Sequence, residues 1–361
     1  MAQRIKLMLQ RSVLLAAILF IVFPLLASPP SELFLPDRPE FQYVGRIDRT
    51  NPLLPKFSAP GAYVRANFSG SSCEILLNDE ELWGKYHNYV TVVIDNGTPQ
   101  RIKLTQKQNV LKFDNLKGSR HSILICKSTE SGIGYIEFAG LSCRAILPPP
   151  NPMVRRIEFI GNSITSGMGS DETSVKCDQG EWYDQHNAYL AYGPITARSL
   201  NSDWMLTSVS GIGLIRSCCD MTITMPGVYD KMNQRDNHGQ WDFSKYTPDV
   251  VTVCLGQNDG IQDSTKFCGA YVDFVTVIRN KYPGASIVLL TSPMGDEKLT
   301  KALTNYLDSV VEEVRSKGDE NISFYSFSKR YHKGCGDHPD LKEHEQISGE
   351  LTMYLKQLMK W

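Results

Sequence analysis

The stretch LPPPNPMVRRIEFIGNSIT, residues 147–165, marks a change in the character of the chain. Residues 147–152 include four prolines, which can neither continue a helix nor donate to a sheet ladder, so this segment indicates a stiff connector. The segment Ile157–Ile160 that follows, three of whose four residues are apolar, is typical of a buried strand. We therefore expect two domains, one at 33–147 and one at 153–361.

After the connector, apolar strand-like runs alternate with helical segments. We expect strands at 157–160, 204–209, 250–255, 286–290 and 322–325, and helices at 189–200, 271–280, 301–316 and 347–358. Alternation of this kind predicts an α/β domain in which a parallel sheet lies between two layers of helices. Chemistry in such sheets gathers at the C-terminal ends of the strands, so a site is expected there.

Before the connector, nearly all the signals are those of β-strands. Tyr63–Phe68 alternates apolar with polar residues, as a half-buried strand does, and Tyr89–Ile94 is rich in β-branched residues. Residues 95–97, Asp-Asn-Gly, then supply the turn of a hairpin. Further short strands are expected at 123–126, 135–138 and 142–145. Many short strands with frequent turns predict a β-sandwich of the jelly-roll type that serves as a scaffold, with glycan contact as a second interpretation.

The N-terminus differs from the rest of the chain. Arg4, Lys6 and Arg11 precede an apolar run over 13–27 that ends in a small residue. This pattern is typical of a secretory signal peptide, here residues 1–27. The alternative is an uncleaved membrane anchor, but the run of about 15 residues is shorter than the ~20 that span a bilayer. We therefore expect a secreted or periplasmic protein with no membrane partner after signal cleavage.

The composition is that of a folded protein without excess charge. Of 361 residues, 42% are hydrophobic, and 38 Lys+Arg nearly balance 39 Asp+Glu, giving a net charge of −1. Because there is no basic block either, no nucleic-acid partner is expected. Nine cysteines leave at least one thiol free and allow one or two structural disulfides, whose pairing the sequence does not define. The cysteines show neither redox nor zinc-ligand spacing.

Four positions near strand ends or in a loop carry candidate chemistry. Ser163 follows the first strand of the second domain and is either a nucleophile on a strand-to-helix turn or a helix cap. Gly211 follows the second strand and either directs an N–H into a site or makes a turn. Asn258 follows the central strand and is either a donor to an oxyanion or part of a turn. His338 lies on a glycine-rich loop and is either a general base or a surface histidine.

A metal site near the C-terminus is a weaker interpretation. Asp337, His338, His344 and Glu345 lie close together along the chain. Neither H-x-x-x-H nor H-E-x-x-H occurs, and Pro339 interrupts any helix that would join the two histidines. We expect no metal and no cofactor.

Taken together and in this order, four blocks resemble those of the SGNH (GDSL-type) hydrolases. The blocks are Gly-Asn-Ser-Ile-Thr at 161–165, Ser-Gly-x-Gly at 210–213, Gly-x-Asn-Asp at 256–259 and Asp-His-Pro at 337–339. The chain also resembles carbohydrate esterase family 2, which pairs a jelly roll with an SGNH domain. That resemblance rests on residues 45–48, 60–61, 127–130, 157–165, 241–243 and 248–251, and it covers nearly all of the chain after the signal peptide.

The resemblance implies roles for four residues. Ser163 would be the nucleophile and His338 its base, while the N–H groups of Ser163 and Gly211 and the side-chain amide of Asn258 would form an oxyanion hole. The implied activity is a carboxylic ester hydrolase that removes O-acetyl groups from plant polysaccharides or oligosaccharides such as xylan or glucomannan, through an acetyl-enzyme.

Two residues depart from the family pattern. Asn162 stands where the family usually has aspartate, and Cys335 stands three residues before the histidine, where the triad acid is usual. Asp337 is a candidate triad acid, but it is adjacent to His338, and neighbouring side chains rarely meet in the required geometry. The other interpretation, which we favour, is a Ser–His dyad whose imidazole is oriented by a backbone carbonyl.

Two other functions remain open on the sequence alone. One is an esterase that acts on peptidoglycan or another acylated glycan, and the other is a glycan-binding protein whose hydrolase domain has decayed. Four aromatic residues in connecting segments either line a sugar cleft or pack in the core: Trp182, Tyr183, Tyr229 and Trp241. Asn67, Asn96 and Asn321 lie in N-x-[ST] sequons. The sequence identifies neither the sugar nor the oligomeric state.

Overall fold

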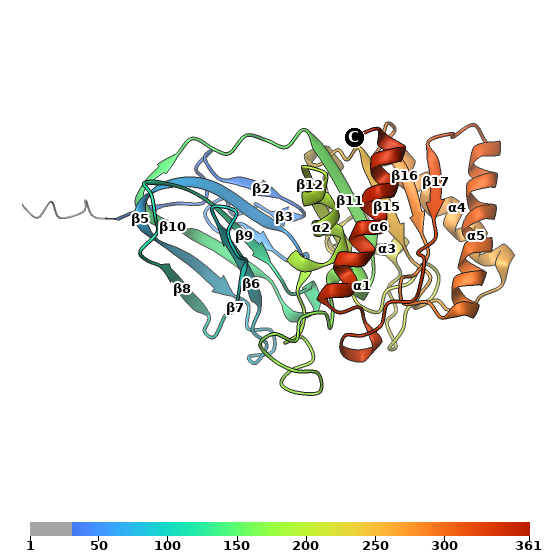
Figure 1. The fold of residues 1–361 in the computed structure, drawn as a ribbon, viewed down its shortest axis with the longest axis horizontal. Helices are drawn as coiled ribbons and strands as arrows, with labels where there is room; N and C mark the ends of the chain where they lie inside the picture. The colour runs from blue at the N-terminus through green and yellow to red at the C-terminus, as the bar shows by residue number, and fades with distance from the viewer. Residues whose placement is uncertain (1–30) are drawn as a thin grey trace, which may run out of the picture. The chain divides into compact units, whose positions relative to one another are not determined.

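Residues 31–361 are described by the computed structural model drawn in Figure 1. The predicted signal peptide, residues 1–27, lies outside the described residues. Within the described part of the chain, no helix combines the length and the apolar character that a membrane crossing requires.

The second half of the chain forms the expected parallel sheet. Its five strands are β11 (Arg155–Gly161), β12 (Ser202–Ser208), β15 (Val250–Cys254), β16 (Ser286–Leu290) and β17 (Ile322–Tyr325). They pair in the order β12-β11-β15-β16-β17, and every pairing is parallel. All five strands predicted from the sequence are therefore present.

Helices cover both faces of this sheet. The four longer ones are α2 (Tyr192–Ser199), α4 (Ser264–Lys281), α5 (Glu297–Ser316) and α6 (Leu341–Met359). Residues of α2 and α6 pack with Phe159 and Leu290 in one core cluster, whereas residues of α4 and α5 pack with Val253 and Leu289 in another. Figure 1 shows α6 lying across β11 and β15. Because both faces are covered, the strands are buried along almost their whole length, and β15 and β16 are almost entirely apolar.

The predicted helices differ from the observed ones mainly at their N-termini. The structure begins α4 at Ser264 and α5 at Glu297, behind Asp263 and Asp296, whose side chains accept from the backbone N–H groups of Lys266 and Leu299. These are N-caps, which hydrophobic periodicity does not reveal. The helix predicted at 189–200 is divided into η2 (Ala188–Leu190) and α2, because Ala191 between them is extended.

The order of the strands reverses at the C-terminal edge of the sheet, next to β11. From β11 the chain crosses to β12 on one side, and it then returns to β15 on the other side of β11. A reversal of this kind is where open α/β sheets bind their ligands. Gly161 at the end of β11 pairs with both Ser208 and Cys254, so the three strands end side by side.

The first half of the chain is an antiparallel sheet domain. Its strands are β1 (Glu32–Phe34), β2 (Gln42–Val44), β3 (Ile47–Asp48), β4 (Lys56–Phe57), β5 (Tyr63–Asp79), β6 (Tyr89–Ile94), β7 (Gln100–Lys103), β8 (Gln108–Phe113), β9 (Arg120–Lys127) and β10 (Ile136–Leu147). They surround one apolar core. The predicted fold class, an antiparallel β domain followed by an SGNH-type α/β domain, is confirmed.

The strands of this domain are longer and more continuous than the sequence suggests. The short strands predicted at 135–138 and 142–145 are parts of one strand, β10, because Gly140 forms a bulge with φ +138° and does not end the pairing. In β5 the buried residues change phase near Gly70, which has φ +127°. Both halves of β5 therefore face the core, and strand pairing links all ten strands of the domain.

The remaining elements are short and lie in the connections. They are η1 (Ser131–Ile133), α1 (Ser163–Ser166), α3 (Met225–Val228), the antiparallel pair β13 (Lys231–Asn233) and β14 (His238–Gln240), η3 (Phe243–Lys245) and η4 (Cys335–Asp337).

A buried ion pair joins the two domains. Arg46 of the first domain donates from Nη1 to the backbone carbonyls of Tyr229 and Lys231, at 2.6 and 2.7 Å, and its Nη2 lies 3.4 Å from Oε1 of Glu158 on β11. The Arg46 and Glu158 side chains are both fully buried. Burial raises the pKa of Glu158, and the guanidinium opposes that shift. Glu158 thus depends on the other domain for its charge partner.

Replacing Arg46 by methionine should destabilise the protein by about 3–5 kcal/mol, because it leaves the buried Glu158 without a partner. Urea denaturation of the Arg46→Met variant measures this loss. Adding Glu158→Gln to the same variant should restore part of the stability, since no charge then remains buried. A single variant as stable as the wild type would show that the pair does not hold the domains together.

Candidate active site

Ser163 is the first residue of α1 and follows β11, a strand inside the sheet, after one intervening residue. A Cβ atom on Gly161 would lie 2.0 Å from Oγ1 of Thr165, so only glycine permits the tight turn from β11 into α1. Asn162 caps α1 by accepting a hydrogen bond from Ile164 N–H at 3.1 Å. A carboxamide oxygen is sufficient for this cap, which explains how the chain tolerates asparagine where the family usually has aspartate. Ser163 itself is nearly buried.

His338 lies on a sharp turn between η4 and α6. Gly336 adopts φ +58°, a conformation that glycine accepts without strain. Pro339 restricts His338 to an extended backbone, with φ −78° and ψ 160°. Asp340 and Glu343 then form a capping box that begins α6. The imidazole is therefore held on a rigid turn in front of the helix.

The structure brings Ser163 and His338 together. Nε2 of His338 lies 2.8 Å from Oγ of Ser163, and Nδ1 lies 2.9 Å from the carbonyl oxygen of Gly336 and 3.2 Å from that of Cys335. Because a carbonyl oxygen only accepts, Nδ1 carries the proton and donates it. Nε2 is then the unprotonated nitrogen that accepts the hydrogen bond of the Ser163 hydroxyl.

The imidazole is suited to stay neutral. Burial lowers the pKa of His338 below its ordinary value of 6.5, although the Gly336 and Cys335 carbonyls and the Asp337 carboxylate oppose the shift. The neutral form therefore dominates at pH 7, and a neutral imidazole is the form that can accept a proton.

The structure does not place the candidate triad acid in that role. Asp337 is exposed, has φ +58°, and within residues 31–361 no hydrogen bond joins its carboxylate to the His338 ring. The reason is geometric, since the turn that points the His338 ring at Ser163 directs its Nδ1 back to its own loop carbonyls. Cys335, at the usual position of the acid, forms a disulfide with Cys177.

This disulfide attaches the histidine turn to another loop. Cys335 N–H also donates to the carbonyl of Gly169 at 2.8 Å, and a Cβ atom on Gly169 would lie 2.5 Å from the Cys335 oxygen. The two segments therefore pack backbone against backbone. A second disulfide joins the neighbours Cys218 and Cys219, so the number of bridges matches the one or two expected from the sequence.

Gly211 and Asn258 lie on two loops that are joined by a hydrogen bond. Nδ2 of Asn258 donates to the carbonyl of Ile212 at 2.8 Å. Gly211 has φ +83°, and a Cβ atom there would meet Sγ of Cys218 at 2.9 Å. Within the described residues, the Gly211 N–H donates no hydrogen bond. Both residues follow strands whose ends flank the end of β11, the strand that leads into Ser163.

Sequence reasoning missed two buried carboxylates that hold these loops. Asp259 accepts from the N–H groups of Leu214, Ile215 and Arg216 at 2.9, 2.7 and 2.9 Å. Glu130, from the first domain, accepts from Ser210 N–H at 2.7 Å. Asp259 ends the block at 256–259 and Glu130 ends the block at 127–130, but neither pattern indicates that the carboxylate accepts from a backbone N–H far away along the chain.

The remaining candidates are placed as follows. Tyr183, Tyr229 and Trp241 are buried and pack in the core, whereas Trp182 is 43% exposed and contacts the ring of His186 with a centroid distance of 4.9 Å. His344 is buried within α6, where burial lowers its pKa to about 3.

Among residues 31–361, one group has metal-like spacing, consisting of Glu172, Cys177 and Cys335. Its two sulfurs are bonded to each other, so they are not available as thiolate ligands.

Comparison with known proteins identifies the family. Residues 159–346 match the model of the GDSL-like lipase/acylhydrolase family, and residues 43–150 match the model described as carbohydrate esterase 2 N-terminal. The chain belongs to the GDSL-like lipase/acylhydrolase family. Its first domain is of the carbohydrate esterase 2 type, so the family predicted from the sequence blocks is confirmed.

This GDSL-like hydrolase is similar to curated carbohydrate esterases. The cellulase/esterase CelE of Acetivibrio thermocellus is 29% identical over 345 residues, which are 90% of this chain and 40% of that protein, so the chain spans less than half of that relative. An acetylxylan esterase/glucomannan deacetylase of Cellvibrio japonicus is 29% identical over 335 residues, 90% of both chains. The predicted enzyme class, a carboxylic ester hydrolase, is that of these relatives.

Solved structures share the fold of most of the chain. A family two carbohydrate esterase from Clostridium thermocellum, in complex with cellohexaose, superposes with a TM-score of 0.81 at 28% identity, over 89% of this chain and 99% of that chain. A family two carbohydrate esterase from Cellvibrio japonicus gives a TM-score of 0.82 at 26% identity, over 92% and 98% of the two chains.

The imidazole of His338 should titrate below pH 6.5, because burial disfavours its charged form. NMR titration of the histidine side chains measures this, with a His338→Gln variant to assign the signal. Asp337→Asn should move the midpoint further down, since it removes a carboxylate that favours the imidazolium. A midpoint at or above 6.5 in the wild type would contradict the burial argument.

Proposed function

We propose that this GDSL-like hydrolase is a secreted serine esterase that removes O-acetyl groups from plant polysaccharides or their oligosaccharides, with xylan and glucomannan as the leading candidates. The observation that carries the proposal is the 2.8 Å contact between Oγ of Ser163 and the unprotonated Nε2 of His338. The relatives named as acetylxylan esterases support the substrate class. The signal-like N-terminus and the two disulfides support action outside the cytoplasm.

In the first half of the reaction, Oγ of Ser163 attacks the acetyl carbonyl carbon while its proton passes to Nε2 of His338. The carbonyl oxygen becomes an oxyanion as the new C–O bond forms. The bond between that carbon and the sugar oxygen then breaks, and His338 gives the proton to the sugar oxygen. The products are a free sugar hydroxyl and an acetyl group on Ser163.

In the second half, water replaces the sugar. His338 takes a proton from the water as it attacks the acetyl carbon, and the tetrahedral intermediate collapses to acetate with return of the proton to Ser163. Nδ1 keeps its proton and donates it to the carbonyls of Gly336 and Cys335 throughout, so the ring keeps its orientation in both halves.

Three donors are proposed to stabilise the oxyanion. They are the N–H of Ser163, the N–H of Gly211 and Nδ2 of Asn258, on loops that follow neighbouring strands. Asn258 uses one of its two amide protons on Ile212 and retains the other. One such donor is typically worth about 3–4 kcal/mol of transition-state stabilisation.

Trp182 is the aromatic residue best placed to contact a sugar. A Cβ atom on Gly132 would lie 3.9 Å from both Trp182 Cη2 and Glu130 Cγ. The indole therefore lies next to Glu130, which accepts a hydrogen bond from Ser210 N–H. Its partial exposure leaves ring surface free for stacking. An indole near the oxyanion loop favours a glycan substrate over a simple ester.

The first test uses 4-nitrophenyl acetate. Ser163→Ala and His338→Ala should each lose most of the activity, a fall of about 10³-fold or more in kcat, because they remove the nucleophile or its base. Asp337→Ala should stay within about threefold of the wild type, since the carboxylate does not touch the ring. Strong loss in Asp337→Ala would instead support a triad acid, and a wild type no faster than buffer would leave the glycan-binding alternative.

The second test separates glycan contact from chemistry. Trp182→Ala should raise KM for acetylated xylo- or manno-oligosaccharides several-fold, about the loss of one stacking contact, while kcat/KM for 4-nitrophenyl acetate stays near that of the wild type. Trp83→Ala is the matched control, because Trp83 is the more exposed indole at 73% and its ring contacts Tyr86 instead of His186. Equal effects of both changes would remove Trp182 from the proposed substrate surface.

A further inference from the structure

The segment Lys127–Ser131, KSTES, belongs to the first domain but reaches the site of the second. Lys127 at the end of β9 is fully buried, and its Nζ donates to the carbonyls of Thr129 and Glu130 at 2.7 and 2.9 Å. These bonds fold the segment back on itself. Burial lowers the pKa of Lys127 to about 7, against the opposing effect of the nearby Glu130 carboxylate.

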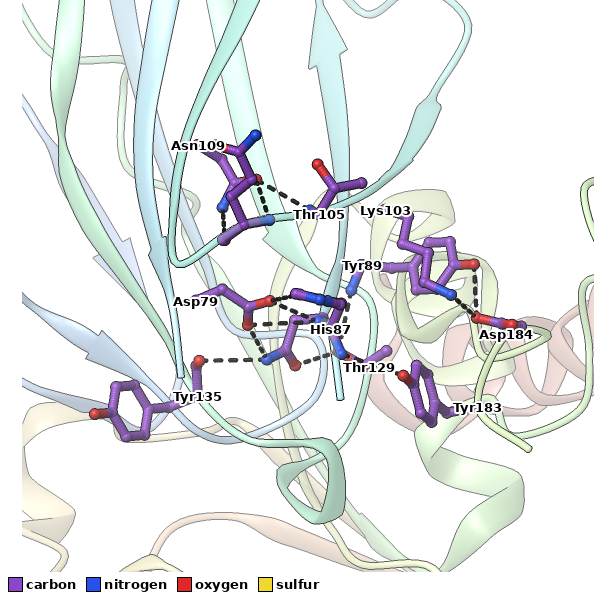
Figure 2. A network of polar contacts seen from close by, with 12 residues as sticks. Asp79, His87, Tyr89, Lys103, Thr105, Asn109, Thr129, Tyr135, Tyr183 and Asp184 are labelled. Atoms are coloured by element: carbon purple, nitrogen blue, oxygen red, sulfur yellow. Dashed lines mark hydrogen bonds and ion pairs between the residues drawn. The ribbon is translucent and has the colours of Figure 1, made fainter. Parts of the chain in front are cut away.

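Hydrogen bonds fix this segment on both sides. Ser128 N–H donates to the carbonyl of Tyr89, and the Ser128 carbonyl accepts from Ala188 N–H, at 2.8 and 2.9 Å. Oγ1 of Thr129 donates to Oδ1 of Asn88 at 2.6 Å. Figure 2 shows Thr129 within a larger network that includes Asp79 and His87. Glu130 therefore extends from a rigid base.

The Glu130 carboxylate is buried against the loop that carries Gly211. The residue is 1% exposed, and its Oε2 accepts from Ser210 N–H at 2.7 Å. Its other oxygen, Oε1, lies 3.9 Å from Nδ1 of His186 and has no hydrogen-bond partner within the described residues. Ser210 immediately precedes Gly211, so the backbone N–H that Glu130 holds and the proposed oxyanion donor belong to consecutive residues.

Such a contact is needed because the loop is intrinsically adaptable. Gly211 lacks a Cβ and has φ +83°, so its own conformational preferences do not fix the direction of its N–H. On the C-terminal side, Cys218 N–H donates to the Gly211 carbonyl, and Asp259 holds residues 214–216. On the N-terminal side, the Ser210 side chain has no partner within the described residues, and the backbone N–H is held by Glu130.

We propose that Glu130 is a positioning residue of the esterase site: its carboxylate holds the peptide before Gly211 so that the Gly211 N–H points at the developing oxyanion. The inference rests on the proposed function and extends it, because the first domain then completes the site of the second. An oxyanion donor acts only within a narrow distance of the oxyanion, so loss of this anchor weakens the transition state more than the bound substrate.

The kinetic test compares Glu130→Ala with Glu130→Gln on 4-nitrophenyl acetate. Glu130→Ala should lower kcat about 10- to 100-fold, somewhat less than removal of an oxyanion donor, with KM within about twofold. Glu130→Gln retains an oxygen acceptor for Ser210 N–H and should keep most of the activity. Tyr63→Phe is the matched control: it removes a buried 2.6 Å hydrogen bond to Asp203 between the same two domains, away from this loop, and should leave kcat unchanged.

Hydrogen exchange tests the contact without relying on activity. In Glu130→Ala, a peptide covering residues 206–214 should exchange faster than in the wild type at a temperature well below the Tm of every variant, while peptides of α4 and α5 keep their wild-type exchange and Glu130→Gln and Tyr63→Phe match the wild type throughout. Unchanged exchange or unchanged kcat in Glu130→Ala would overturn the inference, as would an equal loss of kcat in Tyr63→Phe. If the wild type lacks esterase activity, the proposed function fails, and with it the catalytic role of Glu130, while the exchange data still report whether Glu130 holds the loop.

Discussion

The hydrogen bond between Oγ of Ser163 and Nε2 of His338 is the contact on which the rest of the account depends. It joins two residues that are 175 positions apart in the sequence. One partner is fixed by the end of β11, where only glycine permits the turn, and the other by a turn between Gly336 and Pro339 that directs the ring at Ser163. Both depend on the parallel sheet, whose strand order reverses next to β11, the place where open α/β sheets bind their ligands.

The orientation of the imidazole by carbonyl groups has a physical consequence. A carboxylate would stabilise the imidazolium by charge, whereas the carbonyls of Gly336 and Cys335 offer only dipoles. Burial then outweighs them, and the pKa of His338 falls. A base with a lower pKa is a weaker proton acceptor but is unprotonated over a wider range of pH. The disulfide between Cys177 and Cys335 holds the turn by a covalent bond at the position where relatives of this superfamily usually carry the acid.

Much of the fold and part of the site were accessible from the sequence because they depend on local patterns. Apolar runs revealed the five parallel strands, and their ends pointed to Ser163 and Asn258. Long-range pairing was not accessible. The bulge at Gly140 resembles a turn in sequence, and the partner of Cys335 cannot be derived from spacing. Glu130 and Asp259 were missed for a similar reason, since their role is to bond backbone N–H groups that lie far away along the chain.

The most direct measurement of the central claim is covalent labelling with diethyl 4-nitrophenyl phosphate, which transfers its phosphoryl group to an activated serine and leaves a stable adduct. The account predicts one diethylphosphoryl group per chain, located on Ser163 by peptide mass spectrometry, with loss of esterase activity in proportion to labelling. It also predicts that His338→Ala labels far more slowly, because the hydroxyl then lacks its base. Labelling of a different residue, or full esterase activity in a protein labelled at Ser163, would contradict it.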